Sequence, residues 1–302
     1  MLPLPEKIKI VEVGPRDGLQ NEREAIPTAT KLAFIAKLVQ AGLTQIEATS
    51  FVSPKAVPQL ADAMDLARQL PLAPGVTYSA LTPNMIGLDR AIESGIRRIA
   101  VFTAASETFT KKNINMSIDE SFAAFAPVVS KALTSGMTVR GYVSTAFVCP
   151  FEGDIDEKKT LEVTRRLLDL GVDEVAISDT IGAASPKDVF ETVSSILQSA
   201  PREKIALHFH DTYGTALANV LAGLQLGIST FDASAGGLGG CPYAPGAAGN
   251  LATEDLVYML NRMGITTGVE LQKLADASSL IAASLGSLLP SRQWQRLKSH
   301  LQ

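Results

Sequence analysis

Apolar residues in this chain fall into short β-branched runs, and each run is followed by a stretch whose apolar residues recur at helical spacing. Eight such runs stand out along the chain. They are IKIVEVG (8–14), QIEATSF (45–51), VTYSALT (76–82), RRIAVFTA (97–104), TVRGYVSTA (138–146), DEVAISDT (173–180), IALHFHD (205–211) and TFDASAGG (230–237). Strands that alternate with helices predict βα units and a parallel sheet.

The segments between these runs have the pattern of amphipathic helices that end at a glycine. In residues 28–42, TATKLAFIAKLVQAG, the apolar positions recur on one face, and Gly42 ends the predicted helix. Segments 117–136 and 156–171 also close on a glycine. These helices have the length that is needed to connect parallel strands.

Eight βα units predict a (β/α)₈ barrel, the TIM barrel, within the α/β class. The rival is a doubly wound open sheet, but no GxGxxG motif follows the first strand. We expect one domain over residues 1–302, because no linker or low-complexity segment interrupts the chain. The barrel would span about residues 6–265, and a C-terminal helical extension would span about 266–302.

Composition and charge narrow the possible partners. The chain has 302 residues, of which 46% are hydrophobic, so it can bury a large core. Its net charge is −4 and no basic tract stands out, which argues against nucleic acid. No apolar run reaches membrane-spanning length. The two cysteines, Cys149 and Cys241, form no disulfide framework, so we expect a reduced, cytoplasmic protein.

Chemistry in such barrels lies at the C-terminal ends of the strands, and this chain carries many polar residues there. They are Arg16 and Asp17 after the first strand, Glu47 in the second, Asp179 and Thr180 at the end of the sixth, and His208 and His210 in the seventh. We expect Thr180 to contact a substrate bound at this face.

The sequence LHFHD predicts a metal site. Residues two apart on a strand face the same side, so His208 and His210 point together while Phe209 faces the helices. Asp17 would supply a carboxylate ligand from the first strand, and Arg16 beside it could stabilise a developing oxyanion. The alternatives are two histidines with no shared ligand and an aspartate that only caps a turn.

Two imidazoles and a carboxylate favour Mg²⁺, Mn²⁺ or a similar divalent cation, and zinc is less favoured because no thiolate cluster is present. We expect the buried Glu47 to pair with Arg16 from the neighbouring strand. Asp179 could be a metal ligand, a base or a hydrogen-bond partner. For both acids the alternative is a structural ion pair at the barrel mouth.

The segment GGLGGCPYAPGAAGN (236–250) predicts a lid or a ligand-cradling loop. Within it, Cys241 is either a catalytic thiol or a free cysteine in a loop. Asn250 precedes a predicted helix and could be its N-cap or a metal ligand, and both readings are open. Lys111 and Lys112, in TKKNIN, fit a solvated loop better than a phosphate site.

Together these motifs resemble the 3-hydroxy-3-methylglutaryl-CoA lyase family, from about residue 8 to about residue 272. The matching motifs are VEVGPRDGLQNE, TSFVSPK, FTKKNIN, HFHDTYG, GLGGCPYAPGAAGN and LATEDLVYML. The resemblance implies cleavage of an acyl-CoA thioester, 3-hydroxy-3-methylglutaryl-CoA, to acetyl-CoA and acetoacetate. It also implies a homodimer.

The resemblance also implies roles for single residues. It implies that the divalent cation is bound by Asp17, His208, His210 and Asn250, and that Asp17 or a water-linked acid takes the hydroxyl proton of the substrate. Arg16 would stabilise the enolate that forms on the thioester, Cys241 would be the catalytic cysteine of a mobile loop, and His208 or Cys241 would return a proton to carbon. Glu47, Asp179 and Glu254 match acidic positions that support the site.

Departures from the family pattern flank the predicted pocket. The chain reads SAGGLGGCPY where SVAGLGGCPY is usual, and Thr145 stands where a cysteine is common. An alternative is therefore a lyase for another 3-hydroxy-3-alkylglutaryl-CoA. A Claisen-type synthase and a non-catalytic barrel that binds CoA esters are further alternatives.

Overall fold

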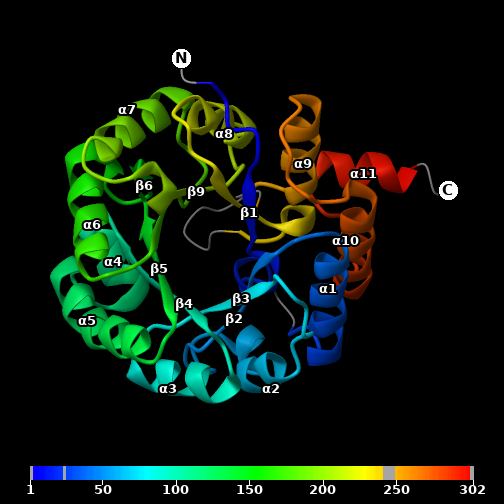
Figure 1. Ribbon diagram of the computed structural model, residues 1–302, viewed down its shortest axis with the longest axis horizontal. Coiled ribbons are helices and arrows are strands. Elements are labelled where there is room, and N and C mark those ends of the chain that lie inside the picture. Colours follow the sequence, from blue (N-terminus) through cyan, green and yellow to red (C-terminus); the bar gives the residue numbers. More distant parts are fainter. Residues whose placement is uncertain (1–2, 23–24, 241–248, 300–302) are drawn as a thin grey trace.

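The computed structural model describes residues 3–22, 25–240 and 249–299. Eight parallel strands close into a barrel, and helices surround it (Figure 1). Around the barrel the strand order is β1-β10-β9-β8-β5-β4-β3-β2. The predicted (β/α)₈ barrel is confirmed.

Each barrel strand lies inside one of the eight predicted runs. The strands are β1 (Lys9–Glu12), β2 (Gln45–Ser50), β3 (Thr77–Leu81), β4 (Arg98–Ala104), β5 (Thr138–Ser144), β8 (Glu174–Asp179), β9 (Ile205–Phe209) and β10 (Thr230–Ala233). The structure adds a small antiparallel hairpin, β6 (Val148–Cys149) and β7 (Gly153–Asp154), that the sequence reading missed. Two-residue strands are too short to show a period.

Helices follow the strands and form the outer layer. They are α1 (Thr28–Gln40), α2 (Ala63–Arg68), α3 (Met85–Ser94), α4 (Glu107–Ile114), α5 (Ile118–Thr134), α6 (Glu157–Asp169), α7 (Pro186–Leu197), α8 (Ala216–Gln225), α9 (Thr253–Arg262), α10 (Leu271–Leu285) and α11 (Arg292–Ser299). Short turns are η1 (Gly14–Gly18), η2 (Pro58–Leu60), η3 (Arg202–Lys204) and η4 (Ala235–Gly237). Among the described helices, none combines the length and the apolar character that crossing a membrane requires.

Local sequence explains where several helices begin. Ser117 before α5 accepts a hydrogen bond from the Glu120 amide, and the Glu120 side chain accepts one from the Ser117 amide. Ser185 and Asp188 make the same reciprocal pair at α7. Such capping boxes satisfy amides that the first helical turn leaves free.

The C-terminal helix α10 is part of the outer ring. It packs against α1 on one side and contacts α9, and Figure 1 shows it beside α1. The sequence reading placed this region after the barrel, as an extension. In the structure α10 contacts both α9 and α1, and α11 adds the buried Trp294, whose indole N–H donates to Ser279 Oγ at 3.0 Å.

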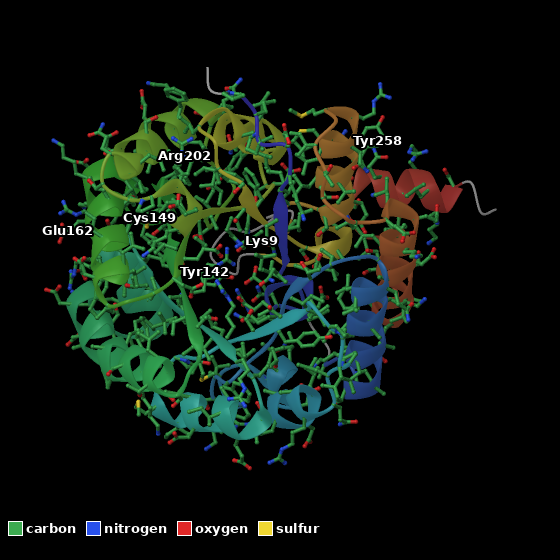
Figure 2. The ribbon with its side chains drawn as sticks, viewed as in Figure 1. Lys9, Tyr142, Cys149, Glu162, Arg202 and Tyr258 are labelled. Carbon is green, nitrogen blue, oxygen red and sulfur yellow. The ribbon has the colours of Figure 1, made fainter. Side chains whose placement is uncertain are left out.

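The barrel has an apolar layer outside the strands and a partly charged interior. Side chains such as Phe34 and Phe231 fill the space between strands and helices. Inside the barrel, small residues surround Tyr142, and charged Arg140 and Asp232 are also fully buried there. Figure 2 shows Tyr142 inside the ring of helices and Glu162 at its periphery.

Gly42 allows α1 and the segment before α10 to approach closely. Its φ is +98°, and a Cβ on it would lie 2.1 Å from the carbonyl oxygen of Gly268. Gly95 has a similar φ of +86°, but nothing lies within 4 Å of the corresponding Cβ position. The two glycines therefore share a backbone conformation and differ in available space.

We predict that Gly42→Ala destabilises the protein more than Gly95→Ala. The Gly95 variant should lose about 1–2 kcal/mol from the left-handed conformation alone. In the Gly42 variant the new Cβ would in addition clash with the Gly268 carbonyl oxygen, and the backbone there would have to shift. Urea unfolding at 25 °C measures both losses, and equal losses would contradict the account.

Candidate active site

The first strand ends in a single π-helical turn, η1, at the mouth of the barrel. The amides of Asp17 and Gly18 both donate to the Val13 carbonyl oxygen, at 2.8 and 3.2 Å. Isolated π-turns often occur at functional sites because the extra residue redirects side chains. Here the turn directs Arg16 and Asp17 to the same face of the barrel.

Arg16 lies between two carboxylates. Its Nε donates to Glu47 Oε1 and its Nη1 donates to Asp17 Oδ1. The second Glu47 oxygen accepts the Tyr142 hydroxyl at 2.7 Å. The predicted pairing of Glu47 with Arg16 is confirmed, and Arg16 is only 7% exposed.

These contacts set the charge of the site. Burial alone would raise the pKa of the Asp17 carboxyl, but the Arg16 charge and the neighbouring histidines lower it well below its usual range. Burial would lower the pKa of Arg16, and Glu47 and Asp17 raise it above its ordinary value. Burial lowers the pKa of His210. The site therefore presents an ionised carboxylate and a neutral imidazole, which are the forms that bind cations.

Asp17, His208 and His210 come together as one group of possible metal ligands. One donor atom from each lies within 4.8 Å of the others. Asn250 joins them, because its Nδ2 donates to Asp17 Oδ2 at 2.8 Å and its backbone bridges to His210. The structure thus contains a possible metal site, as the sequence predicted.

Two buried polar atoms in this group lack a hydrogen-bond partner in the described structure. They are Asn250 Oδ1 and His210 Nδ1. Buried polar atoms without a partner are costly, and a bound cation would satisfy such an oxygen or nitrogen. The donor set therefore fits a divalent cation. The reading of Asn250 as a helix N-cap is wrong, since Ala252 occupies that position at α9.

Sequence reasoning missed the residues behind His208. Its Nδ1 lies 3.2 Å from Asp232 Oδ2, and Arg140 donates to both Asp232 oxygens. Burial would raise the pKa of Asp232, but Arg140 holds it below its ordinary value. A charged residue within an otherwise apolar strand was the available signal, in TVRGYVS and in TFDA.

A cavity of about 150 Å³ opens beside these residues. Its lining includes the polar Arg16 and Thr180 and the apolar Leu81, Phe102 and Phe109. The full lining is Arg16, Asp17, Gln20, Asn21, Leu81, Phe102, Phe109, Asn113, Tyr142, Ser144, Ser178, Thr180, His208, His210 and Gly240. The cavity therefore offers both polar and apolar contacts to a bound group.

Two predicted acids, Asp179 and Glu254, are not members of this group of possible metal ligands. Asp179 accepts the amides of Ala183 and Ala184, each at 3.0 Å, and so holds the loop after β8. Burial raises its pKa to about 6. Glu254 accepts the Gly236 amide at 2.8 Å and the Ser278 hydroxyl, and burial raises its pKa to about 7.

Two other predicted features have different outcomes. Cys241 lies outside the described residues, as does most of the glycine-rich segment. The expected loop around Lys111 and Lys112 is wrong, since both residues lie in α4. Ser106 starts that helix by accepting the Phe109 amide at 3.0 Å, and Lys112 Nζ lies 4.3 Å from the centre of the Phe151 ring.

The fold and the site define a class of protein: a closed parallel barrel with a carboxylate and two histidines at the carboxyl ends of its strands, beside a buried arginine. The family model described as HMGL-like matches residues 7–281. The chain belongs to this family.

Relatives of known name and solved structures match this chain over nearly its whole length. The chain is 53% identical to the mitochondrial hydroxymethylglutaryl-CoA lyase of Bos taurus, over 93% of this chain and 86% of that protein. It is 50% identical to a hydroxymethylglutaryl-CoA lyase of Bacillus subtilis, over 99% of this chain and 100% of that protein. The crystal structure of the Bacillus subtilis HMG-CoA lyase superposes with a TM-score of 0.97 at 49% identity, covering 98% of this chain and 100% of that one.

A further solved structure carries ligands. An HMG-CoA lyase from Acinetobacter baumannii, in complex with coenzyme A and 3-methylmalate, superposes with a TM-score of 0.92 at 40% identity. It covers 98% of this chain and 96% of that one.

We predict that Mn²⁺ stabilises the metal-free protein against heat and that Asn250→Ala weakens this effect. Asn250 has a buried oxygen aimed at no protein donor, so its loss should raise the Kd of the cation by about tenfold or more. Thermal unfolding across a Mn²⁺ titration measures the change. Asn219→Ala is the control, because Asn219 is an equally buried amide in α8. Equal Mn²⁺ shifts in the two variants would contradict a metal role for Asn250.

We predict that Glu254→Gln flattens the dependence of stability on pH. The pKa of Glu254 is raised from 4.5 to about 7 in the folded protein, so the folded state binds more protons than the unfolded state between these values. Stability must then fall as pH rises through this window, by at most about 1.4 kcal/mol per pH unit. Urea unfolding from pH 5 to 8 should show that the free energy of unfolding of the variant increases relative to that of the wild type as pH rises. A constant difference would show that the carboxyl does not titrate there.

Proposed function

We propose that this protein is a carbon–carbon lyase that uses a divalent cation to cleave 3-hydroxy-3-methylglutaryl-CoA into acetyl-CoA and acetoacetate. The observation that carries the proposal is the placement of Arg16 and Asp17 beside His208 and His210 at one cavity. The relatives that are about half identical over nearly their full length are named for this activity.

Asp17, His208, His210 and Asn250 would hold the cation, and their oxygen and nitrogen atoms favour Mg²⁺ or Mn²⁺. When bound, such a cation lowers the pKa of a substrate hydroxyl and fixes its position. Asp17 suits a ligand better than a base, because its low pKa makes it a weak proton acceptor.

Arg16 would face the thioester oxygen. An acid linked to the substrate hydroxyl through water would take its proton. The electrons of the O–H bond then form a new carbonyl, the C2–C3 bond breaks, and the electrons of that bond move onto the thioester as an enolate. The buried guanidinium is fixed by Glu47 and Asp17 before the reaction starts, so it can stabilise that charge without reorganising.

A proton must then return to carbon to give acetyl-CoA. His208 and Gly240 line the cavity. Cys241 is the next residue after Gly240 in the sequence. The resemblance implies one of these two donors, and Cys241 is favoured because a His208 ring that binds the cation through one nitrogen and contacts Asp232 through the other has no N–H left to donate. Glu47, Asp179 and Glu254 would act as supports, Glu47 by holding Arg16 and the other two by holding the loops around the mouth.

The substituent at C3 of the substrate is the finer part of the proposal. The apolar residues Leu81, Phe102 and Phe109 in the cavity lining support an alkyl group at this position, and the family resemblance favours methyl. A lyase for a longer 3-hydroxy-3-alkylglutaryl-CoA is the second candidate, because Thr145 departs from the family pattern and its amide donates to the hydroxyl of Thr180, which lines the cavity.

The wider proposal is a single-domain, cytoplasmic homodimer that acts on acyl-CoA thioesters. The complex of the Acinetobacter baumannii relative with coenzyme A supports the substrate class. Sedimentation of the purified protein tests the dimer directly.

Purified protein with Mg²⁺ and 3-hydroxy-3-methylglutaryl-CoA should release acetoacetate. A panel of thioesters with larger 3-alkyl groups should give lower kcat/KM as the group grows. Absence of acetoacetate from folded, cation-bound protein would exclude the proposed activity, and a higher kcat/KM for a larger group would favour the second candidate.

We predict that Arg16→Gln lowers kcat by about 10²–10³-fold with little change in KM. The arginine is proposed to act on charge that develops only in the transition state. Steady-state kinetics measure both constants. Arg98→Gln is the control, since Arg98 pairs with Asp173 on the other end of the barrel strands and should keep normal kcat. An Arg16 variant that changes only KM would contradict the enolate role.

A further inference from the structure

A continuous buried chain of polar contacts runs from the interior of the barrel to His208. Arg140 Nε lies 2.9 Å from Glu174 Oε1, and Arg140 Nη2 donates to Asp232 Oδ1 at 2.7 Å. Asp232 Oδ2 then meets His208 Nδ1 at 3.2 Å. Arg140 and Asp232 are each 1% exposed, so water does not compete for these contacts.

Strand register places the two ends of this chain together. Asp232 on β10 pairs directly with His208 on β9. Residues side by side on neighbouring strands of one barrel point to the same side of the sheet. The contact is therefore built into the barrel and does not depend on a loop.

The contact determines which nitrogen of His208 carries hydrogen. Both oxygens of an ionised carboxylate accept and neither donates. Arg140 supplies a hydrogen bond to each oxygen, which keeps the carboxylate in place. His208 Nδ1 must then be the donor, so the lone pair of a neutral ring lies on Nε2, the nitrogen that Asp232 leaves free.

Arg140 is also connected to Arg16 through hydrogen bonds. Its Nη1 donates to the Tyr142 hydroxyl at 2.9 Å as well as to Asp232, and Tyr142 in turn donates to Glu47. Glu47 holds Arg16. One buried guanidinium is thus linked to the histidine and, through two further residues, to the arginine.

We propose that Asp232, held by Arg140, is a positioning residue that fixes His208 as the Nδ1–H tautomer and so keeps Nε2 available for the cation. The importance of Nε2 rests on the proposed function. The tautomer itself does not, and it can be measured in the protein without metal or substrate.

Nitrogen NMR of the metal-free, full-length protein labelled with [¹⁵N]histidine is the first test. The chain has 3 histidines, so the imidazole spectrum is simple, and the missing signal in His208→Gln assigns the residue. In its neutral form the His208 ring should show a protonated Nδ1 and an unprotonated Nε2. A neutral ring protonated at Nε2 would overturn the proposal.

Asp232→Asn should reverse the tautomer. Arg140 Nη2 has Asp232 Oδ1 as its hydrogen-bond acceptor, whereas Nη1 also has Tyr142, so the amide oxygen should face Nη2. The amide NH₂ group then faces His208 Nδ1 and donates to it, which moves the ring hydrogen to Nε2. Calorimetric titration with Mn²⁺ should show a Kd raised by about 10–100-fold.

Glu174→Gln is the matched control. Glu174 is another buried acid on Arg140, but the contacts of its carboxylate are with Arg140, Lys9 and Arg98. This variant removes a charge from the same network and should keep both the wild-type His208 tautomer and the wild-type Kd for Mn²⁺. A purely structural role for the network would instead give both variants the same loss of stability and the same Kd.

The possible results separate the two proposals. An Nδ1–H ring in the wild type, with reversal and weaker Mn²⁺ binding in Asp232→Asn, supports the positioning role even if no thioester is cleaved. Unchanged tautomer and Kd in a folded Asp232→Asn protein overturn it, even if the lyase activity is confirmed. If that variant does not fold, the wild-type spectrum alone decides.

Discussion

The buried charge of Arg16 is the constraint on which this site depends. A guanidinium removed from water must be surrounded by acceptors, and losing one partner of such a buried pair costs about 3–5 kcal/mol. Arg16 obtains its partners from two places, Asp17 in the same π-turn and Glu47 on the next strand. Fixing the arginine therefore fixes the aspartate, and the aspartate in turn accepts from Asn250 across the mouth.

The same requirement explains the unusual interior of the barrel. Many (β/α)₈ barrels fill this space with branched apolar side chains, but here Arg140, Asp232 and Glu174 occupy part of it. Their mutual contacts compensate the loss of water, and the apolar layer between strands and helices supplies the hydrophobic stabilisation. Contacts with this polar interior fix the side chains at the mouth of the barrel, so these side chains are already oriented to stabilise charge that develops during the reaction.

Much of the fold was predictable because βα alternation and strand period follow directly from local sequence. The eight barrel strands and the shared direction of His208 and His210 were of this kind. The π-turn was not predictable, since it is one extra residue in a short turn. The link between Asp232 and His208 was also missed, because it depends on register between strands that are distant in sequence. Asn250 was left undecided by spacing alone, and its orphaned oxygen now favours the ligand role.

The central claim is that Asp17, His208 and His210 hold one divalent cation beside Arg16. The most direct measurement is electron spin echo spectroscopy of the Mn²⁺-loaded protein, prepared with [¹⁵N]histidine. The account predicts hyperfine coupling from two imidazole nitrogens, with one of them lost in His208→Gln. A spectrum with no imidazole coupling, from protein that binds one equivalent of Mn²⁺, would contradict it.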